Sequence, residues 1–191
     1  MMNGTSLLCM GWKPEEGFLH AYWDWYNEGI LAYALAIGSP THPIPLANRH
    51  FCMDHAQEFP GYGENGWGLT AGQGPGGYQA YGTQPAEAVR HDGTLVPSGM
   101  VAAIPLVPYV AIPSVAYWHQ AYGERVYGRY GFVSGFNLGK HWWSDRYIGI
   151  EQGVSVLMIE NYRSGLVWKT FMREPAIQRW IDLCLTRTPG S

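Results

Sequence analysis

Single carboxylates stand among Trp, Tyr and Gly residues at four places in the 191-residue sequence. The apolar faces of sugar rings stack on aromatic side chains, and sugar hydroxyls bind Asp, Glu, Asn and His. Cleavage of a glycosidic bond needs two carboxyl groups, one as an acid and the other as a base or nucleophile. The pattern therefore suits a carbohydrate-cleaving cleft, and an aromatic core with its acids in solvent is the alternative. The four places are residues 23–28 (WDWYNE), 61–68 (GYGENGWG), 147–153 (YIGIEQG) and 158–164 (MIENYRS).

Two of these carboxylates have different predicted environments. Glu64 is a lone acid among glycines and aromatics, so we expect partial desolvation, which raises a carboxyl pKa and suits a general acid. Glu151 opens a predicted helix, and the helix N-terminus would keep its carboxylate ionised, which suits a general base. The alternatives are an exposed loop acid at Glu64 and simple helix-end stabilisation at Glu151.

The remaining acids of these clusters lie on predicted helices. Asp24 and Glu28 are four residues apart, so they share a helix face. Stabilisation of the helix N-terminus by these two acids is the alternative to a place in the cleft. Glu160 and Arg163 are three residues apart, a spacing that favours a structural ion pair.

The charge and composition argue against several other classes of function. The chain has 12 Lys+Arg and 15 Asp+Glu, a net charge of −3, whereas a nucleic-acid-binding face needs an excess of basic residues. A hydrophobic content of 47%, with 15% aromatics, predicts a folded core rather than disorder. The most apolar stretch, residues 100–118, contains three prolines and does not predict a membrane span. The first residues show no secretory signal.

The sequence predicts neither a cofactor nor a metal. It contains no P-loop, dinucleotide-binding fingerprint or G-x-S-x-G motif. The seven histidines are scattered, and His50 and His55 are five residues apart rather than the four of a helical metal-binding pair.

The elements that must position these residues are predicted to be helices joined by aromatic loops. Apolar residues recur every three or four positions in residues 17–37, which predicts a helix. The prolines of residues 41–45 predict an extended connector after it. The segments 60–99 and 130–147 show little periodicity and no convincing strand. The predicted fold class is therefore all-α. The other helices are expected at residues 46–57, 113–122, 151–162, 166–172 and 175–185.

Five longer motifs follow one another along the chain. They are MGWKPE at residues 10–15, NEGILAYALAIGSPTHP at 27–43, GYGENGWGLTA at 61–71, DGT at 92–94, and the segment from GIEQG to MIENYRSGLVWKTFM at 149–172. In this order they resemble the glycoamylase-like family, which includes bacterial endo-β-1,2-glucanases and a domain of cyclic β-1,2-glucan synthases. The resemblance covers most of the chain, and its motifs are specific.

That resemblance implies an (α/α)6 toroid whose central cleft hydrolyses internal β-1,2 bonds of a glucan. It implies Glu64 as the general acid and Glu151 as the general base. An oligosaccharide or polysaccharide is then the expected partner, without a cofactor, nucleic acid or membrane. Relatives are often periplasmic or secreted, but the sequence does not assign a compartment to this chain. The substrate-binding residues that it implies are Asp24, Glu28, Asn65, Trp67, Tyr78, Tyr81, Asp92 and Trp142.

The sequence departs from the family pattern at several positions. Glu151 replaces an Asp in the family's GIDQG motif, and Gln73 stands where the family has an acid. Residues 45–46 join two segments that a longer stretch separates in the family, which predicts an internal deletion there. Twelve helices of about 12 residues each, with their loops, need well over 191 residues. We therefore expect residues 1–191 to form one incomplete domain, a partial toroid with about half of the barrel helices and long aromatic, Gly-rich loops.

Three interpretations follow from this short length. The chain is a truncated hydrolase, a degenerate member that binds glucan without cleaving it, or a part that a second chain or self-association completes. An open half-cleft predicts exposed aromatic patches larger than a monomer normally carries. Full burial of Trp67, Tyr78, Trp142 and Trp143 would contradict it.

Overall fold

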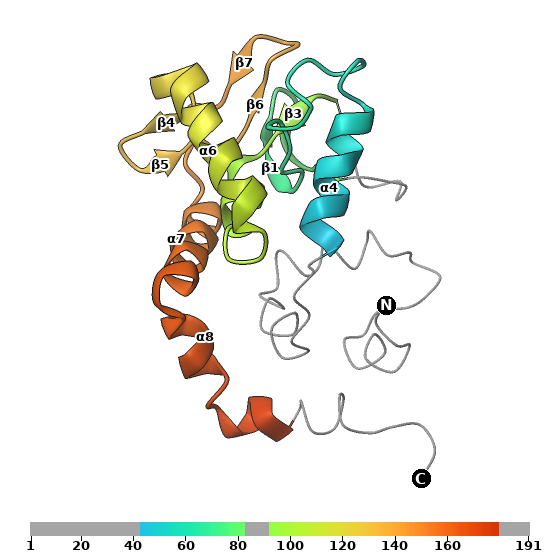
Figure 1. Cartoon of the computed structure of the whole chain (residues 1–191). Coiled ribbons are helices and arrows are strands. Elements are labelled where there is room, and N and C mark those ends of the chain that lie inside the picture. Colours follow the sequence, from blue (N-terminus) through green and yellow to red (C-terminus); the bar gives the residue numbers. More distant parts are fainter. Residues whose placement is uncertain (1–42, 83–91, 180–191) are drawn as a thin grey trace.

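A computed structural model describes residues 43–82 and 92–179 (Figure 1). The helices are α4 (Pro43–Asp54), α5 (Pro97–Ala102), α6 (Pro108–Tyr122), α7 (Gly149–Ser164) and α8 (Leu166–Phe171), with the 3-10 turn η2 (Gly123–Arg125) after α6. The strands are β1 (Ala71–Gly74), β2 (Gly77–Ala80), β3 (Thr94–Leu95), β4 (Tyr127–Gly128), β5 (Gly131–Phe132), β6 (Phe136–Asn137) and β7 (Trp142–Trp143).

The described part of the chain is not all-α, because the segments expected as loops contain short antiparallel strands. β1 pairs with β2, β4 pairs with β5, and β6 lies between β3 and β7. In the first hairpin Gly74 pairs with Gly77, so Pro75 and Gly76 form a two-residue turn. Pro and Gly at adjacent central positions favour a tight turn. Strands of two to four residues are too short to show a period of two in the sequence, and this explains why they were missed.

The helix predicted at residues 17–37 lies outside the described residues, and α5 was not predicted, because residues 60–99 were expected to be irregular. The predicted helices that fall within the described residues are present, but some of their starts differ. α4 begins at Pro43, whereas residues 41–45 were expected to be extended, so that prediction is wrong from Pro43 onwards. Proline is tolerated in the first turn because the N–H that it lacks has no helical partner there. α6 likewise begins at Pro108, five residues before its predicted start, and contains Pro113. α7 and α8 lie within two residues of their predicted bounds.

The core lies around α5. All six residues of this helix are buried, and it packs against both α6 and α7. Trp118 of α6 meets Phe136 of β6 edge to face, with 4.9 Å between the ring centroids. Trp67, in the segment before β1, is also fully buried. These contacts fix the strands and the loop of residues 60–68 relative to the helices.

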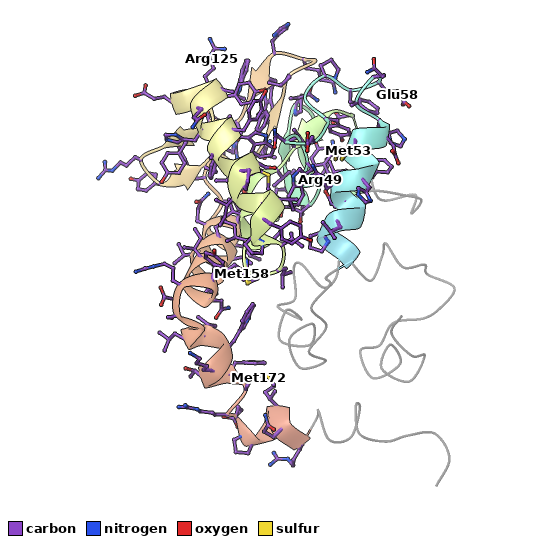
Figure 2. The ribbon with its side chains drawn as sticks, in the orientation of Figure 1. Arg49, Met53, Glu58, Arg125, Met158 and Met172 are labelled. Atoms are coloured by element: carbon purple, nitrogen blue, oxygen red, sulfur yellow. The ribbon has the colours of Figure 1, made fainter. Side chains whose placement is uncertain are left out.

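α7 and α8 extend away from α4, α6 and the strands (Figure 1). One side of α7, which carries Met158, faces the core (Figure 2). Val156, Leu157 and Tyr162 of the same helix are each about half exposed or more. Apolar side chains on several sides are typical of a helix that other elements surround. In the described residues, α7 therefore exposes more apolar surface than a helix that is surrounded by other elements of a core.

The aromatic residues proposed as the test of an open half-cleft behave differently from one another. Trp67 is buried, Tyr78 is 52% exposed, and Trp142 and Trp143 are half-buried. The four are thus not all enclosed in a core, and the half-cleft prediction is not contradicted.

Candidate active site

Glu64 lies at the tip of a tight loop built from glycines. The N–H of Gly63 donates to the carbonyl of Gly66 (2.9 Å), and the N–H of Gly66 donates back to the carbonyl of Gly63 (3.1 Å). A Cβ atom at Gly66 would lie 1.6 Å from the carbonyl oxygen of Gly61. Only glycine fits at position 66.

Helix α4 holds this loop in place. Asn48 is buried, and its Oδ1 accepts the N–H groups of Gly68 and Leu69 (3.0 and 3.1 Å). Its Nδ2 donates to the Leu69 carbonyl (3.0 Å). The next residue of α4, Arg49, labelled in Figure 2, donates through Nε to the Glu64 carbonyl (3.0 Å) and through Nη2 to Glu64 Oε1 (2.9 Å). Asn48 thus fixes the backbone, and Arg49 fixes the carboxylate.

Helix α6 holds the other side of the same loop. Ser114 Oγ accepts the indole N–H of Trp67 (3.0 Å) and lies 3.2 Å from Oδ1 of Asn65. Because the Trp67 ring is fully buried, it is part of the core. Its predicted contact with a sugar therefore has no support in these residues, whereas half-buried Asn65 stays next to Glu64 at the loop.

Glu151 is a buried carboxylate in the first turn of α7, with 4% of its surface exposed. Its Oε1 accepts a hydrogen bond from Ser134 Oγ (2.7 Å), and its Oε2 is buried without a hydrogen-bond partner. Burial raises the pKa of Glu151 to about 7, although the hydrogen bond from Ser134 acts in the opposite direction. Near neutral pH this side chain is therefore able both to give and to take a proton.

The β1–β2 hairpin lies beside Glu151. Partial burial raises the pKa of the Tyr78 hydroxyl on β2, and the charge of Glu151 raises it further. On β1, the backbone N–H of Gln73 donates to Ser134 Oγ (2.9 Å). Among the predicted sugar-binding residues that the structure describes, Tyr78 is the one connected electrostatically with Glu151.

Asp92 belongs to a turn rather than to either carboxylate. Its Oδ1 accepts the N–H of Thr94 (3.0 Å), and its Oδ2 pairs with Lys140. Burial raises the pKa of Asp92, but the hydrogen bonds from Lys140 and Thr94 outweigh it, so the pKa lies below its usual value. Asn137 bridges the Asp92 carbonyl and the Thr94 hydroxyl. This network gives Asp92 a structural task.

The other predicted site residues are placed as follows. Tyr81 is buried, with its hydroxyl directly over Gly74, where a Cβ atom would lie 1.6 Å from that oxygen. Trp142 pairs with Asn137 at the edge of the three-stranded sheet and is half-buried. Asp24 and Glu28 lie outside the described residues. In the described ranges, no group of three His, Cys, Asp or Glu side chains could hold a metal ion.

The environments of Glu64 and Glu151 are the reverse of those expected. The Glu64 side chain is 74% exposed and paired with Arg49, whereas desolvation was expected there. Glu151 is the desolvated one, so the helix N-terminus does not dominate its pKa. Sequence reasoning also missed Arg49, Ser114 and Ser134, because each lies 15 or more residues from its partner and no local pattern marks it.

The helices of the described ranges include none that is both long and apolar enough to cross a membrane.

Comparison with known proteins adds the family. The model of the Glycoamylase family matches residues 44–175. An exo-β-1,2-glucooligosaccharide sophorohydrolase of Parabacteroides distasonis is 36% identical over 135 residues, which is 71% of this chain and 18% of that protein.

Two solved structures are similar to the described fold. An endo-β-1,2-glucanase from Chitinophaga pinensis, in complex with sophorotriose and glucose, matches with a TM-score of 0.66 and 34% identity over 73% of this chain. A β-1,2-glucanase from Parabacteroides distasonis matches with a TM-score of 0.69 and 34% identity over 75% of this chain. The chain covers only 32% and 20% of those two proteins. From its motifs, its fold and these matches, the chain belongs to the glycoamylase-like family.

Proposed function

We propose that this chain is part of a glycoside hydrolase that cleaves β-1,2-glucan by general acid and base catalysis. The observation that supports it most is Glu151, a buried carboxylate with one unpartnered oxygen, whose charge acts on the half-exposed Tyr78. The relatives named for β-1,2-glucan hydrolysis support the substrate class. A partial (α/α)6 toroid with an internal deletion near residues 45–46 belongs to the same proposal, and α4 runs without interruption through that position.

Glu64 would give its proton to the oxygen of the leaving sugar, and Glu151 would take a proton from the attacking water. The raised pKa of Glu151 makes it a stronger base once ionised, above about pH 7. At Glu64, the exposed side chain leaves room for a sugar ring.

The test is hydrolysis of linear β-1,2-glucan by the 191-residue chain. We expect short oligosaccharides, and we expect Glu64→Gln and Glu151→Gln each to lower their release at least about 100-fold. Glu124→Gln, at an exposed acid after α6, is the matched control. A β-1,3-glucan serves as the linkage control. Equal hydrolysis by all three variants would overturn the assignment of the two carboxylates.

A binding module without turnover is the second candidate. It is favoured by the small share of the relatives that the chain covers, 18% to 32%, and by Gln73, which cannot ionise. In this case β-1,2-glucan binds, as measured by calorimetry, while the polymer keeps its length. Absence of both binding and cleavage would refute a β-1,2-glucan function for this chain.

Completion of the cleft by a second chain or by self-association is supported by the exposed apolar side chains of α7. Val156 and Leu157 are 65% and 49% exposed. If α7 meets another subunit, Val156→Glu lowers the mass measured by light scattering, whereas Glu124→Gln leaves it unchanged. A wild-type chain that stays monomeric at every concentration contradicts self-association.

A further inference from the structure

Ser134 stands between Glu151 and the β1 strand, and it is fully buried. Its hydroxyl accepts the backbone N–H of Gln73 (2.9 Å) and donates to Glu151 Oε1 (2.7 Å). A serine hydroxyl carries one proton, so a donor on one side leaves that proton for the acceptor on the other. The Gln73 N–H therefore orients the Ser134 proton toward the carboxylate.

Two glycines make this arrangement sterically feasible. A Cβ atom at Gly72 would lie 3.0 Å from the Ser134 carbonyl oxygen and 2.6 Å from a Val96 methyl carbon. A Cβ atom at Gly135 would lie 2.2 Å from the Gln73 carbonyl oxygen. Because neither glycine has a side chain, β1 can approach the segment before β6 closely enough for the Gln73 N–H to reach Ser134.

The Ser134 backbone and the start of α7 are held from other directions. The Ser134 N–H donates to the Arg146 carbonyl (2.9 Å), and the Gln152 side chain donates to the Phe132 carbonyl on β5 (2.7 Å). Both ends of the Ser134–Glu151 hydrogen bond are thus fixed by bonds that do not involve the carboxylate. In the carboxylate, Oε1 has Ser134 as its hydrogen-bond partner, and Oε2 has none.

We propose that Ser134 is a positioning residue for Glu151, holding Oε1 so that Oε2 is free for proton transfer. This inference rests on the proposed hydrolase function. In that reaction a water O–H bond breaks, its proton goes to Oε2 and its oxygen bonds to the anomeric carbon. The glycosidic bond breaks, and the leaving oxygen takes the proton of Glu64. Ser134 exchanges no proton in this step. It sets the direction and the basicity of the carboxylate.

Few other titratable groups in the described part of the chain influence the ionisation of Glu151. The titratable neighbour from the hairpin is Tyr78, and α5, which packs against α7, contributes no titratable side chain. α8 joins the far end of α7, where Lys169 bonds to the Ser164 carbonyl. In the described residues, a change at Ser134 therefore acts on Glu151 without passing through another charged pair.

The experiment is direct titration of Glu151 by NMR of 13C-labelled glutamate carboxyls, with the signal assigned by Glu151→Gln. We expect Ser134→Ala to raise the pKa of Glu151 by about one pH unit, because a hydrogen bond to the ionised form is lost. Ser134→Cys keeps the size of the side chain but is a weak donor, so it should do the same with less risk to folding. Ser134→Thr keeps the hydroxyl and should restore the wild-type value.

Ser155→Ala is the matched control, because its hydroxyl donates to the Glu151 backbone carbonyl and not to the carboxylate (2.8 Å). On β-1,2-glucan, the acidic limb of the pH profile of kcat should move upward with the titration, while KM stays within about twofold. An unchanged Glu151 titration in both Ser134→Ala and Ser134→Cys overturns the inference, as does a profile that stays fixed while the titration moves. A shifted titration in a chain that never cleaves glucan refutes the proposed function and leaves the hydrogen bond confirmed.

Discussion

Glu64 and Glu151 are the same residue type in opposite surroundings. Glu64 sits on a loop tip in water, and an arginine of α4 holds its carboxylate. Glu151 sits inside, held by one serine hydroxyl, with its second oxygen unpaired. Water screens the first carboxylate, whereas the protein interior raises the energy of the ionised form of the second. Glu151 is thus the carboxylate whose ionised form is destabilised by burial.

The largest expected effect is on the pH dependence of stability at Glu151. Its folded-state pKa is about 7 against an ordinary 4.5, so the unfolded chain releases this proton first as the pH rises. The contribution of Glu151 to the free energy of unfolding is fully present below about pH 4.5 and is lost as the pH rises through 7. The loss amounts to roughly 3 kcal/mol. Glu151→Gln keeps an acceptor for Ser134 and should remove that loss, as urea unfolding at pH 5 and pH 8 would show.

Glu64→Gln is the matching control for that measurement. Its carboxylate is mostly exposed, so its removal should leave the pH dependence close to that of the wild type. If Glu64→Gln flattens the pH dependence of the free energy of unfolding as much as Glu151→Gln does, the proposed difference between the two carboxylates is wrong.

A middle-sized effect is expected where α4 holds the Glu64 loop. Asn48→Ala removes three hydrogen bonds to Gly68 and Leu69 and leaves buried backbone groups unpaired. The free energy of unfolding should fall by about 2 kcal/mol, measured by urea denaturation. His50→Ala, on an exposed position of the same helix, should change it by less than about 0.5 kcal/mol. Equal losses in the two variants would show that Asn48 does not anchor the loop.

The smallest expected effect is the coupling between Arg49 and Glu64. A double-mutant cycle with Arg49→Met and Glu64→Gln should give less than about 1 kcal/mol, and the value should fall as salt is added. The carboxylate is 74% exposed, so water competes for both charges. A coupling above about 2 kcal/mol that salt does not change would show that the Glu64 site is closed to water.

Motifs with strong local constraints were predictable. The segment that contains Glu64 was expected to be irregular, and the spacing of Glu160 and Arg163 predicted the ion pair that is observed at 3.4 Å. α7 and α8 were placed by their helical patterns, and the structure shows a left-handed Gly165 between them. The short strands and the early start of α4 at Pro43 were not predicted, since two-residue ladders and first-turn prolines carry little local signal.

The sequence by itself determined the family, the longer described helices and the identity of the two candidate catalytic carboxylates, because motifs and helical periods are properties of neighbouring residues. Only the tertiary structure decided which carboxylate is buried. Glu151 lies beside Ser134 because Gly72 and Gly135 let distant backbones approach. Glu64 stays in water because Arg49, 15 residues earlier, holds it at the surface of the described fold. Burial and long-range pairing arise from packing, and local sequence does not encode them.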